Sequence, residues 1–373
     1  MGLILDPKKT GSELRQNRIF QVEPDVDKSD IESVVEYLNS GGWLTEHKVT
    51  ESLELEIKNY VEREHAFSVP NGTIAIYLSL LASGIKKGSR VAVPNLTMIA
   101  TINSVLWADA TPVLVDVDES LCMSYEKLAE VNDLDAVIFV PLNGRTGDGE
   151  KIEEWCKKNK IVLIEDSAHA LSSCYSEKKC GSLGDLSIFS FTPHKIITMG
   201  QGGMILTNNP EFADNIFKLK TFNRSKEKLD WHDGFGLNFK ITDIQASLGL
   251  SQFKKLEKYA NKKKENFNTY KNNINNSEID FIEFNNNEVP WFFDIICSNV
   301  EIKNKIRDSL EDSNIETRDC YPPLSLQSYL EDIDKTNLEN SEKISERILW
   351  LPSSNNLKEN EILEISEIIS SKV

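Results

Sequence analysis

The sequence lacks the features that mark several large classes of protein. Six cysteines, at positions 122, 156, 174, 180, 297 and 320, include no C-x-x-C pair, so a zinc ribbon or dithiol redox site is disfavoured and reduced thiols are expected. No apolar run approaches the length that spans a membrane. The opening MGLILD is too short for a signal peptide and lacks the Ser or Thr of a myristoylation motif. We therefore expect a cytoplasmic protein without a membrane partner.

Positive charge is also scarce. The chain carries 42 Lys and Arg against 59 Asp and Glu, which gives a formal charge of −17. A nucleic-acid-binding surface needs a positive field, so this balance argues against a nucleic-acid partner. An anionic small substrate would need a few cations focused in its site. With 373 residues and 40% hydrophobic content, the chain can bury a core of enzyme size.

Short segments rich in Val and Ile alternate with helical patterns through the first half of the chain. The predicted strands span residues 90–93, 112–117, 136–142, 161–164, 186–191 and 203–207. The predicted helices include residues 50–61, with Thr50 as a plausible cap, and 74–83, 99–108 and 150–158. This rhythm predicts an α/β fold with a mostly parallel sheet, helices on both faces, and ligands at the carboxyl ends of the strands.

The chain divides into three predicted parts. Residues 1–20 are polar and unpatterned and are expected to form an N-terminal arm, and residues 21–255 hold the alternating pattern and form a large domain. A long helix from Ile244 to about Tyr270, with Leu248, Phe253 and Leu256 as its apolar stripe, is expected to cross to a smaller C-terminal α+β domain over residues 256–373.

The densest chemical signal is the stretch SFTPHKIITMGQGGM, residues 190–204. Lys195 follows a predicted strand and precedes a turn with glycines at 200, 202 and 203. Three glycines within four positions suit a close approach of the backbone to a ligand. Partial desolvation would favour the neutral amine, the form that attacks a carbonyl. A surface lysine beside a loop explains the same pattern, so this stretch alone leaves both interpretations open.

Polar residues also stand at two other element ends. Asp166 follows a predicted strand, where it either caps a helix from Ser167 or holds a protonated ring nitrogen of a cofactor. His169 could reach the same ligand or could be a satisfied structural histidine. Gly72 and Thr73 open a buried helix whose free N–H groups either bind an anion or only begin a core helix.

Taken together, these motifs resemble the DegT family of sugar-nucleotide aminotransferases. The resemblance covers about residues 20–373 and rests on five elements in register, namely Asn71-Gly72-Thr73, Glu165-Asp166-x-x-His169, Ser190-Phe191-x-x-x-Lys195, Gly200-x-Gly202-Gly203, and Gly236-x-Asn238-Phe239-Lys240-x-Thr242-Asp243-x-Gln245-Ala246. It implies a pyridoxal-phosphate-dependent transferase of fold type I that works as a homodimer with shared active sites.

The resemblance also implies a role for individual residues. Lys195 would form the internal aldimine with pyridoxal 5′-phosphate, Asp166 would pair with its ring nitrogen, and His169 would lie near its phenolic oxygen. The other implied cofactor contacts are Gly72, Thr73, Met98, Ser190 and, from the neighbouring subunit, Asn238. The expected substrate contacts are Lys240, Arg224, Arg318 and Tyr321. No metal is expected.

This chain departs from the family pattern at four places. Thr97-Met98 stands where many relatives have an aromatic ring after the threonine, and Pro141 replaces the histidine of a V-H-x-x-G element. Ser325 stands where a histidine is common, and Lys240 where arginine is usual. These changes leave the implied cofactor site intact and concern the identity of the substrate instead.

The implied reaction transfers an amino group, with L-glutamate as the expected donor, to a nucleotide-linked keto sugar. The form K-x-I-T-x-G-x-G-G, from Lys195 to Gly203, is similar to members that aminate a 4-keto-6-deoxyhexose, perosamine synthase-like enzymes of lipopolysaccharide or O-antigen biosynthesis. The alternatives are a 3-aminotransferase, a 3-dehydratase that carries His at the lysine position, and a catalytically inactive regulatory protein on the same fold. Lys195 argues against the dehydratase.

Overall fold

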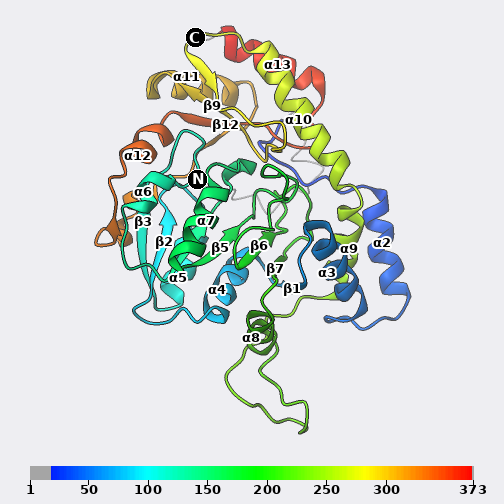
Figure 1. The fold of residues 1–373 in the computed structure, drawn as a ribbon. Coiled ribbons are helices and arrows are strands. Elements are labelled where there is room, and N and C mark those ends of the chain that lie inside the picture. Colours follow the sequence, from blue (N-terminus) through cyan, green and yellow to red (C-terminus); the bar gives the residue numbers. More distant parts are fainter. Residues whose placement is uncertain (1–17, 372–373) are drawn as a thin grey trace.

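The structure, a computed structural model, describes residues 18–371, so most of the predicted N-terminal arm lies outside the described residues. A large sheet occupies the middle of the molecule (Figure 1). A smaller sheet with long helices beside it lies at one end, and a looped segment extends from the other. No helix among residues 18–371 combines the length and apolar character that a membrane crossing requires.

The described chain forms an eight-stranded large sheet. Its strands, in spatial order, are β1 (His65–Val69), β7 (Gly203–Thr207), β6 (Leu186–Ser190), β5 (Val162–Asp166), β4 (Ala136–Phe139), β2 (Arg90–Pro94), β3 (Thr111–Val115) and β11 (Asp334–Lys335). Strand β7 runs antiparallel to both β1 and β6, whereas the other pairs are parallel. The predicted mostly parallel α/β sheet is therefore confirmed.

Helices cover both faces of this sheet. They are α3 (Lys48–Val61), α4 (Gly72–Ala82), α5 (Ala100–Trp107), α6 (Tyr125–Ala129), α7 (Gly149–Asn159), α8 (Pro210–Lys220) and α9 (Asp243–Phe253). Helix α2 (Lys28–Asn39) packs against the outer side of α9 (Figure 1). Alternate residues of β2 pack on opposite faces of the sheet. Val91 and Val93 pack with α4 and α5, whereas Ala92 belongs to the apolar cluster that includes residues of α7. A sheet buried on both faces requires such continuous apolar strands.

The C-terminal part adds a second, antiparallel sheet. Its strands, in spatial order, are β10 (Arg318–Asp319), β12 (Ile348–Leu351), β9 (Phe293–Cys297) and β8 (Ile279–Phe281). The accompanying helices are α10 (Leu256–Asn273), α11 (Val300–Asp312), α12 (Glu339–Ser345) and α13 (Glu359–Ser371). The domain boundary near residue 255 stays a prediction, because β11 from the C-terminal part pairs with β3 of the large sheet.

Several elements differ from their sequence-based predictions. Residues 167–173 form turns, so no helix begins at Ser167 and the capping interpretation of Asp166 is wrong. The predicted helix 244–270 is broken into α9 and α10, and Phe253 is only half-buried. The buried face of α9 carries small residues instead, because a Cβ on Gly249 would lie 2.9 Å from a side-chain carbon of Met199. The strand predicted over 136–142 ends at Phe139.

The cap of α3 also differs from the prediction. The helix begins at Lys48, so Thr50 lies inside its first turn. The cap comes from the first residue of α9: the Asp243 carboxylate accepts the N–H groups of His47 (2.8 Å), Val49 (3.0 Å) and Thr50 (3.0 Å), and the Thr50 hydroxyl (2.7 Å). One buried carboxylate thus satisfies donors that α3 cannot satisfy itself and ties two distant helices together.

We predict that Asp243→Ala lowers the free energy of unfolding by about 3 kcal/mol, because several buried donors lose a charged acceptor. Thr50→Val removes one of these hydrogen bonds and should cost only about 1 kcal/mol. Denaturant titration of both variants checks the ratio. Equal losses would show that Asp243 contributes no more than its single bond to Thr50.

The stabilisation by Asp243 should depend on pH. Burial alone would raise the pKa of Asp243, but the hydrogen bonds from Thr50, Val49 and His47 hold this pKa below its ordinary value. Because the folded-state pKa is depressed, the stabilisation is present above the unfolded pKa of about 3.9 and is lost as the pH falls through the folded pKa. The stability difference between wild type and Asp243→Ala should therefore persist at pH 6 and shrink below about pH 4.

Candidate active site

A cavity of about 600 Å³ opens where the parallel strands end. Strand β5 ends at Asp166, β6 ends at Ser190, and α4 begins at Gly72 on the same edge. Residues from the C-terminal part, among them Arg318 and Tyr321, close the other side. The predicted site residues that line this cavity are Gly72, Thr73, Met98, Asp166, His169, Ser190, Lys195, Arg318 and Tyr321.

The first turn of α4 has the features of an anion site. The Asn71 side chain caps the helix by accepting the N–H of Ile74 at 3.0 Å, which leaves the N–H groups of Gly72 and Thr73 without an intrahelical acceptor. A Cβ on Gly72 would lie 3.1 Å from the Cβ of Ser190, so glycine is what lets this serine approach the helix end. Free N–H groups, a helix dipole and two hydroxyls fit the phosphate of pyridoxal 5′-phosphate.

Asp166 lies buried at the floor of the cavity. Its Oδ2 accepts the Thr101 hydroxyl at 3.2 Å, and its Oδ1 accepts the N–H of Ala168 at 3.3 Å. Burial raises the pKa of Asp166, although the Ala168 N–H, the charge of Lys195 and the Thr101 hydroxyl oppose this shift. The carboxylate makes no ion pair with the residues that the structure describes. A buried carboxylate of this kind suits a protonated ring nitrogen.

His169 lies over the indole ring of Trp291, with a distance of 3.8 Å between the ring centroids. The backbone N–H of Asn143 faces its Nδ1 at 3.5 Å. Burial lowers the pKa of His169 well below its usual value, and the positive charges of Lys195, His194 and Arg318 lower it further. The ring is therefore neutral at pH 7 with its proton on Nε2, so it can donate a hydrogen bond to a ligand oxygen.

Lys195 is half-buried beside these residues, in the turn after β6. Burial lowers its pKa to about 7; the nearby charge of Asp166 opposes that shift, and the charge of Arg318 adds to it. A substantial fraction of the amine is therefore neutral at pH 7. A neutral amine can attack a carbonyl and accept a proton, which an ordinary surface lysine with its pKa near 10 does rarely at this pH.

Two contributors to the site carry little signal in the sequence. Thr101, in the first turn of α5, bonds both Asp166 and the hydroxyl of Thr97 (3.1 Å), which lies in the loop before that helix. Trp291 is almost 100 residues beyond Lys195 and reaches the site through the fold alone. Its indole N–H donates to the carbonyl of His194 at 2.7 Å.

The substrate side of the cavity combines an exposed thioether with a guanidinium. Met98 is 43% exposed, and its sulfur accepts the N–H of Ala100 at 3.0 Å. The Arg318 guanidinium lies 5.5 Å from the Tyr321 ring centroid and 5.4 Å from that of Trp350. Arg318 forms no ion pair within residues 18–371, so its charge is available to an anionic ligand.

Three predicted site residues lie outside the cavity of a single chain. Arg224, Asn238 and Lys240 are exposed in the segment 221–240, which leaves the body of the molecule after α8 (Figure 1). The base of this segment is closed by backbone hydrogen bonds from Phe222 to Leu237 (2.9 Å) and from residue 237 to residue 219 (2.7 Å). These three assignments therefore require contact with a second chain and stay predictions.

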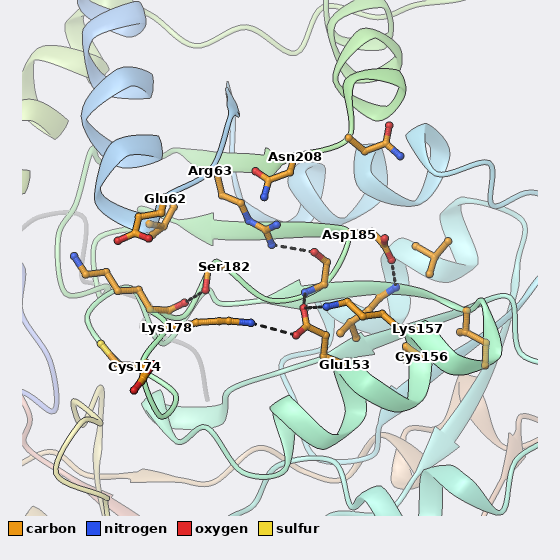
Figure 2. A pocket seen from close by; sticks show the side chains of 18 of the residues that line it. Glu62, Arg63, Glu153, Cys156, Lys157, Cys174, Lys178, Ser182, Asp185 and Asn208 are labelled. Carbon is orange, nitrogen blue, oxygen red and sulfur yellow. Dashed lines mark hydrogen bonds and ion pairs between the residues drawn. The ribbon is translucent and has the colours of Figure 1, made fainter.

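A larger cavity, of about 1040 Å³, lies at the opposite edge of the large sheet, where β5 and β6 begin (Figure 2). Several of its ionisable groups partner one another or the backbone: Lys157 and Lys178 both pair with Glu153, and Arg63 donates to the carbonyls of residues 183 and 184. No motif residue within the described chain lines it. Size alone therefore does not identify the site, and the smaller cavity is the candidate.

Comparisons with curated proteins give relatives over nearly the whole chain. The GDP-perosamine synthase of Escherichia coli O157:H7 is 33% identical over 355 residues, which covers 93% of this chain and 96% of that protein. The GDP-perosamine synthase of Vibrio cholerae is 30% identical, with 93% and 97% of the two chains covered.

Solved structures agree with the sequence relatives. Helicobacter pylori PseC, an aminotransferase involved in the biosynthesis of pseudoaminic acid, superposes with a TM-score of 0.89 at 25% identity over 95% of this chain and 99% of its own. Spr1654 of Streptococcus pneumoniae, in its PLP form, gives a TM-score of 0.86 at 26% identity over 94% and 97% of the chains. The predicted transferase fold with its smaller C-terminal part is thereby confirmed.

The family profile matches almost all of the described residues. It covers residues 24–370 and carries the description DegT/DnrJ/EryC1/StrS aminotransferase family. The motifs that suggested the resemblance, among them those of Gly72, Asp166 and Lys195, all lie within this range. The chain therefore belongs to the DegT/DnrJ/EryC1/StrS aminotransferase family.

Proposed function

We propose that this chain is a pyridoxal-phosphate-dependent aminotransferase that passes an amino group from L-glutamate to a nucleotide-linked keto sugar. The observation that carries the proposal is the convergence of three groups on one cavity: a half-buried Lys195 amine, the buried Asp166 carboxylate, and the open N-terminus of α4 at Gly72. An amine, a carboxylate and an anion site in this arrangement match the reactive aldehyde, ring nitrogen and phosphate of one cofactor.

The residues of the chain have separate tasks in this proposal. Lys195 moves a proton as base and then as acid, because its pKa of about 7 lies near the working pH. Asp166 holds a protonated ring nitrogen, and His169 donates from Nε2 to an oxygen on the same ring. The cofactor supplies the electron sink that makes the carbon next to nitrogen acidic. Ser190 and the α4 N-terminus fix the position of the phosphate.

The sugar class follows from the relatives. Two GDP-perosamine synthases match the chain nearly end to end, and the K-x-I-T-x-G-x-G-G form after Ser190 points to the same group. A 4-keto-6-deoxyhexose is accordingly the proposed acceptor, in O-antigen or related polysaccharide synthesis. No structural observation favours the 3-aminotransferase, the dehydratase or the inactive regulatory protein over this assignment.

We propose that the enzyme is a cytoplasmic homodimer with shared sites. The segment 221–240 exposes Leu229 (95%), Trp231 (55%) and Phe235 (70%), apolar surface that a second copy would cover. The same segment carries Asn238 and Lys240, which cannot serve the cavity of their own chain in their present position. A cytoplasmic location agrees with six free cysteines, five of which are buried.

Asp166→Asn tests the role of the buried carboxylate. The substitution keeps the shape and removes the charge, so amino transfer should fall about a hundredfold or more while cofactor binding changes little. Thr101→Val is the matched control, because it removes a hydrogen bond to Asp166 but keeps the charge, and it should cost less than about tenfold. Near-normal rates in Asp166→Asn, measured in single-turnover assays with glutamate, would contradict the proposed role.

Lys240→Gln tests the substrate side. The Michaelis constant for the nucleotide sugar should rise about tenfold, because a charge-assisted contact to the diphosphate is lost, whereas the glutamate half-reaction should not change. Lys226→Gln, an exposed lysine on the same segment, should alter neither half. If Lys240→Gln affects both half-reactions equally, the residue does not contact the nucleotide.

Shared sites predict that two inactive variants restore each other. Lys195→Ala removes the reactive amine from one side of the site, and Asn238→Asp sets a carboxylate against the cofactor phosphate from the partner's side. A mixed dimer places both defects in one site and leaves the other native. Random pairing should therefore return roughly a quarter of wild-type activity after co-expression.

The experiment needs a mixed dimer of verified composition and two parent variants that fold. Differently tagged subunits allow it to be purified and its composition verified before the assay. Each parent variant must fold and dimerise alone. Verified mixed dimers without activity would show that Asn238 acts within its own subunit or not at all.

A further inference from the structure

Trp291 is a buried ring with a fully anchored backbone. Its N–H donates to the carbonyl of Asn143 at 2.9 Å, and its own carbonyl accepts the amine of Lys263 at 2.8 Å. The indole N–H donates to the carbonyl of His194 at 2.7 Å. Lys263 also donates to the carbonyl of Ser353. Every polar group of Trp291 is thus held by a different part of the chain, so the orientation of the ring is fixed.

The ring faces the two residues that act on the ligand. Its centroid lies 3.8 Å from that of His169 and 4.0 Å from the Nζ atom of Lys195. The Lys195 amine makes no hydrogen bond or ion pair with any residue in the described part of the chain. An aromatic face at this distance attracts an ammonium through its negative quadrupole and does not accept a hydrogen bond strongly.

We infer that Trp291 is a positioning residue for Lys195, whose indole face holds the protonated amine beside the reaction centre while the amine waits to return its proton. The inference rests on the proposed role of Lys195. A carboxylate in this place would form a strong ion pair and keep the proton on the amine. A purely aliphatic wall would offer no attraction to the charged form. An aromatic face lies between these limits, because it stabilises the ammonium modestly and releases it readily.

Other charged groups act on the same amine. Asp166 at the end of β5 favours the ammonium, and Arg318 on β10 disfavours it. His169 and His194 are held neutral by burial, which lowers the pKa of each, and the charge of Lys195 lowers both further. These charged groups stay in the chain when the indole is replaced. Both Trp291→Leu and Trp291→Phe lose the indole N–H that donates to the carbonyl of His194, so the difference between the two variants isolates the aromatic face.

The experiment measures the pKa of Lys195 in full-length protein freed of cofactor, with no sugar and no amino donor present. The labelling rate of Lys195 by trinitrobenzenesulfonate is followed from pH 5 to pH 10 by peptide mass spectrometry. The wild-type midpoint is expected near the pKa of about 7. Trp291→Leu should lower the midpoint by about 1 pH unit, because the ammonium loses its aromatic partner. Trp291→Phe keeps a ring and should lower it by less than half as much.

Trp155→Leu provides the matched control. This tryptophan lies on α7 and packs against the same core cluster as Trp291, away from the cavity. Its replacement should leave the Lys195 midpoint unchanged. An unchanged or raised midpoint in folded Trp291→Leu overturns the inference. If Trp291→Leu does not fold, Trp291→Phe decides in the same way. The measurement needs no turnover, so its failure leaves the proposed aminotransferase function standing, and the substrate assays test that function separately.

Discussion

The buried ion pair between Arg145 and Asp294 is the interaction on which the site depends. The two side chains are 1% and 0% exposed, and the guanidinium binds both carboxylate oxygens, at 2.5 and 2.8 Å. Asp294 belongs to β9 of the small sheet, and Arg145 follows β4 of the large sheet. Loss of one partner would leave an uncompensated charge in the core, so this pair locks the two sheets in one arrangement. Tyr321 lines the cavity, and Trp291 packs against His169 and Lys195, only in that arrangement.

Asn143 connects the Arg145–Asp294 ion pair to His169 in the candidate site. Its side chain donates to the Asp294 carboxylate at 2.8 Å, its carbonyl accepts the N–H of Trp291, and its own N–H faces His169. The residue adopts a φ of 55°, a left-handed conformation that asparagine tolerates better than most residues. Asn143 therefore links the position of the small sheet to that of the His169 ring. Asn143 lies in the chain's counterpart of the family's V-H-x-x-G element, two residues after Pro141, which replaces the histidine of that element.

The sequence predicted the part of the site that depends on short-range chain geometry. Asp166 ends β5, Lys195 follows β6, and Gly72 begins α4 after β1. These three strands run in the same direction, so their carboxyl ends lie on one edge of the sheet. Trp291 could not be predicted, because its place is set by packing between distant segments and leaves no periodic trace. The prediction of the α3 cap was wrong for a similar reason. Thr50 was the candidate close in the sequence, whereas the actual acceptor, Asp243, is 193 residues away from it.

The closed base of the segment 221–240 separates variation in this segment from the elements around it. The chain leaves and re-enters the body between Leu219 and Asn238, joined there by backbone hydrogen bonds and a bridge between Thr221 and Asn238. Immediately afterwards, Thr242 and Asp243 fix the chain to α9 and α3. A loop whose ends are held this closely can change in length and composition without moving the scaffold. Insertions or substitutions within it would therefore leave α3, α8 and α9 in their places.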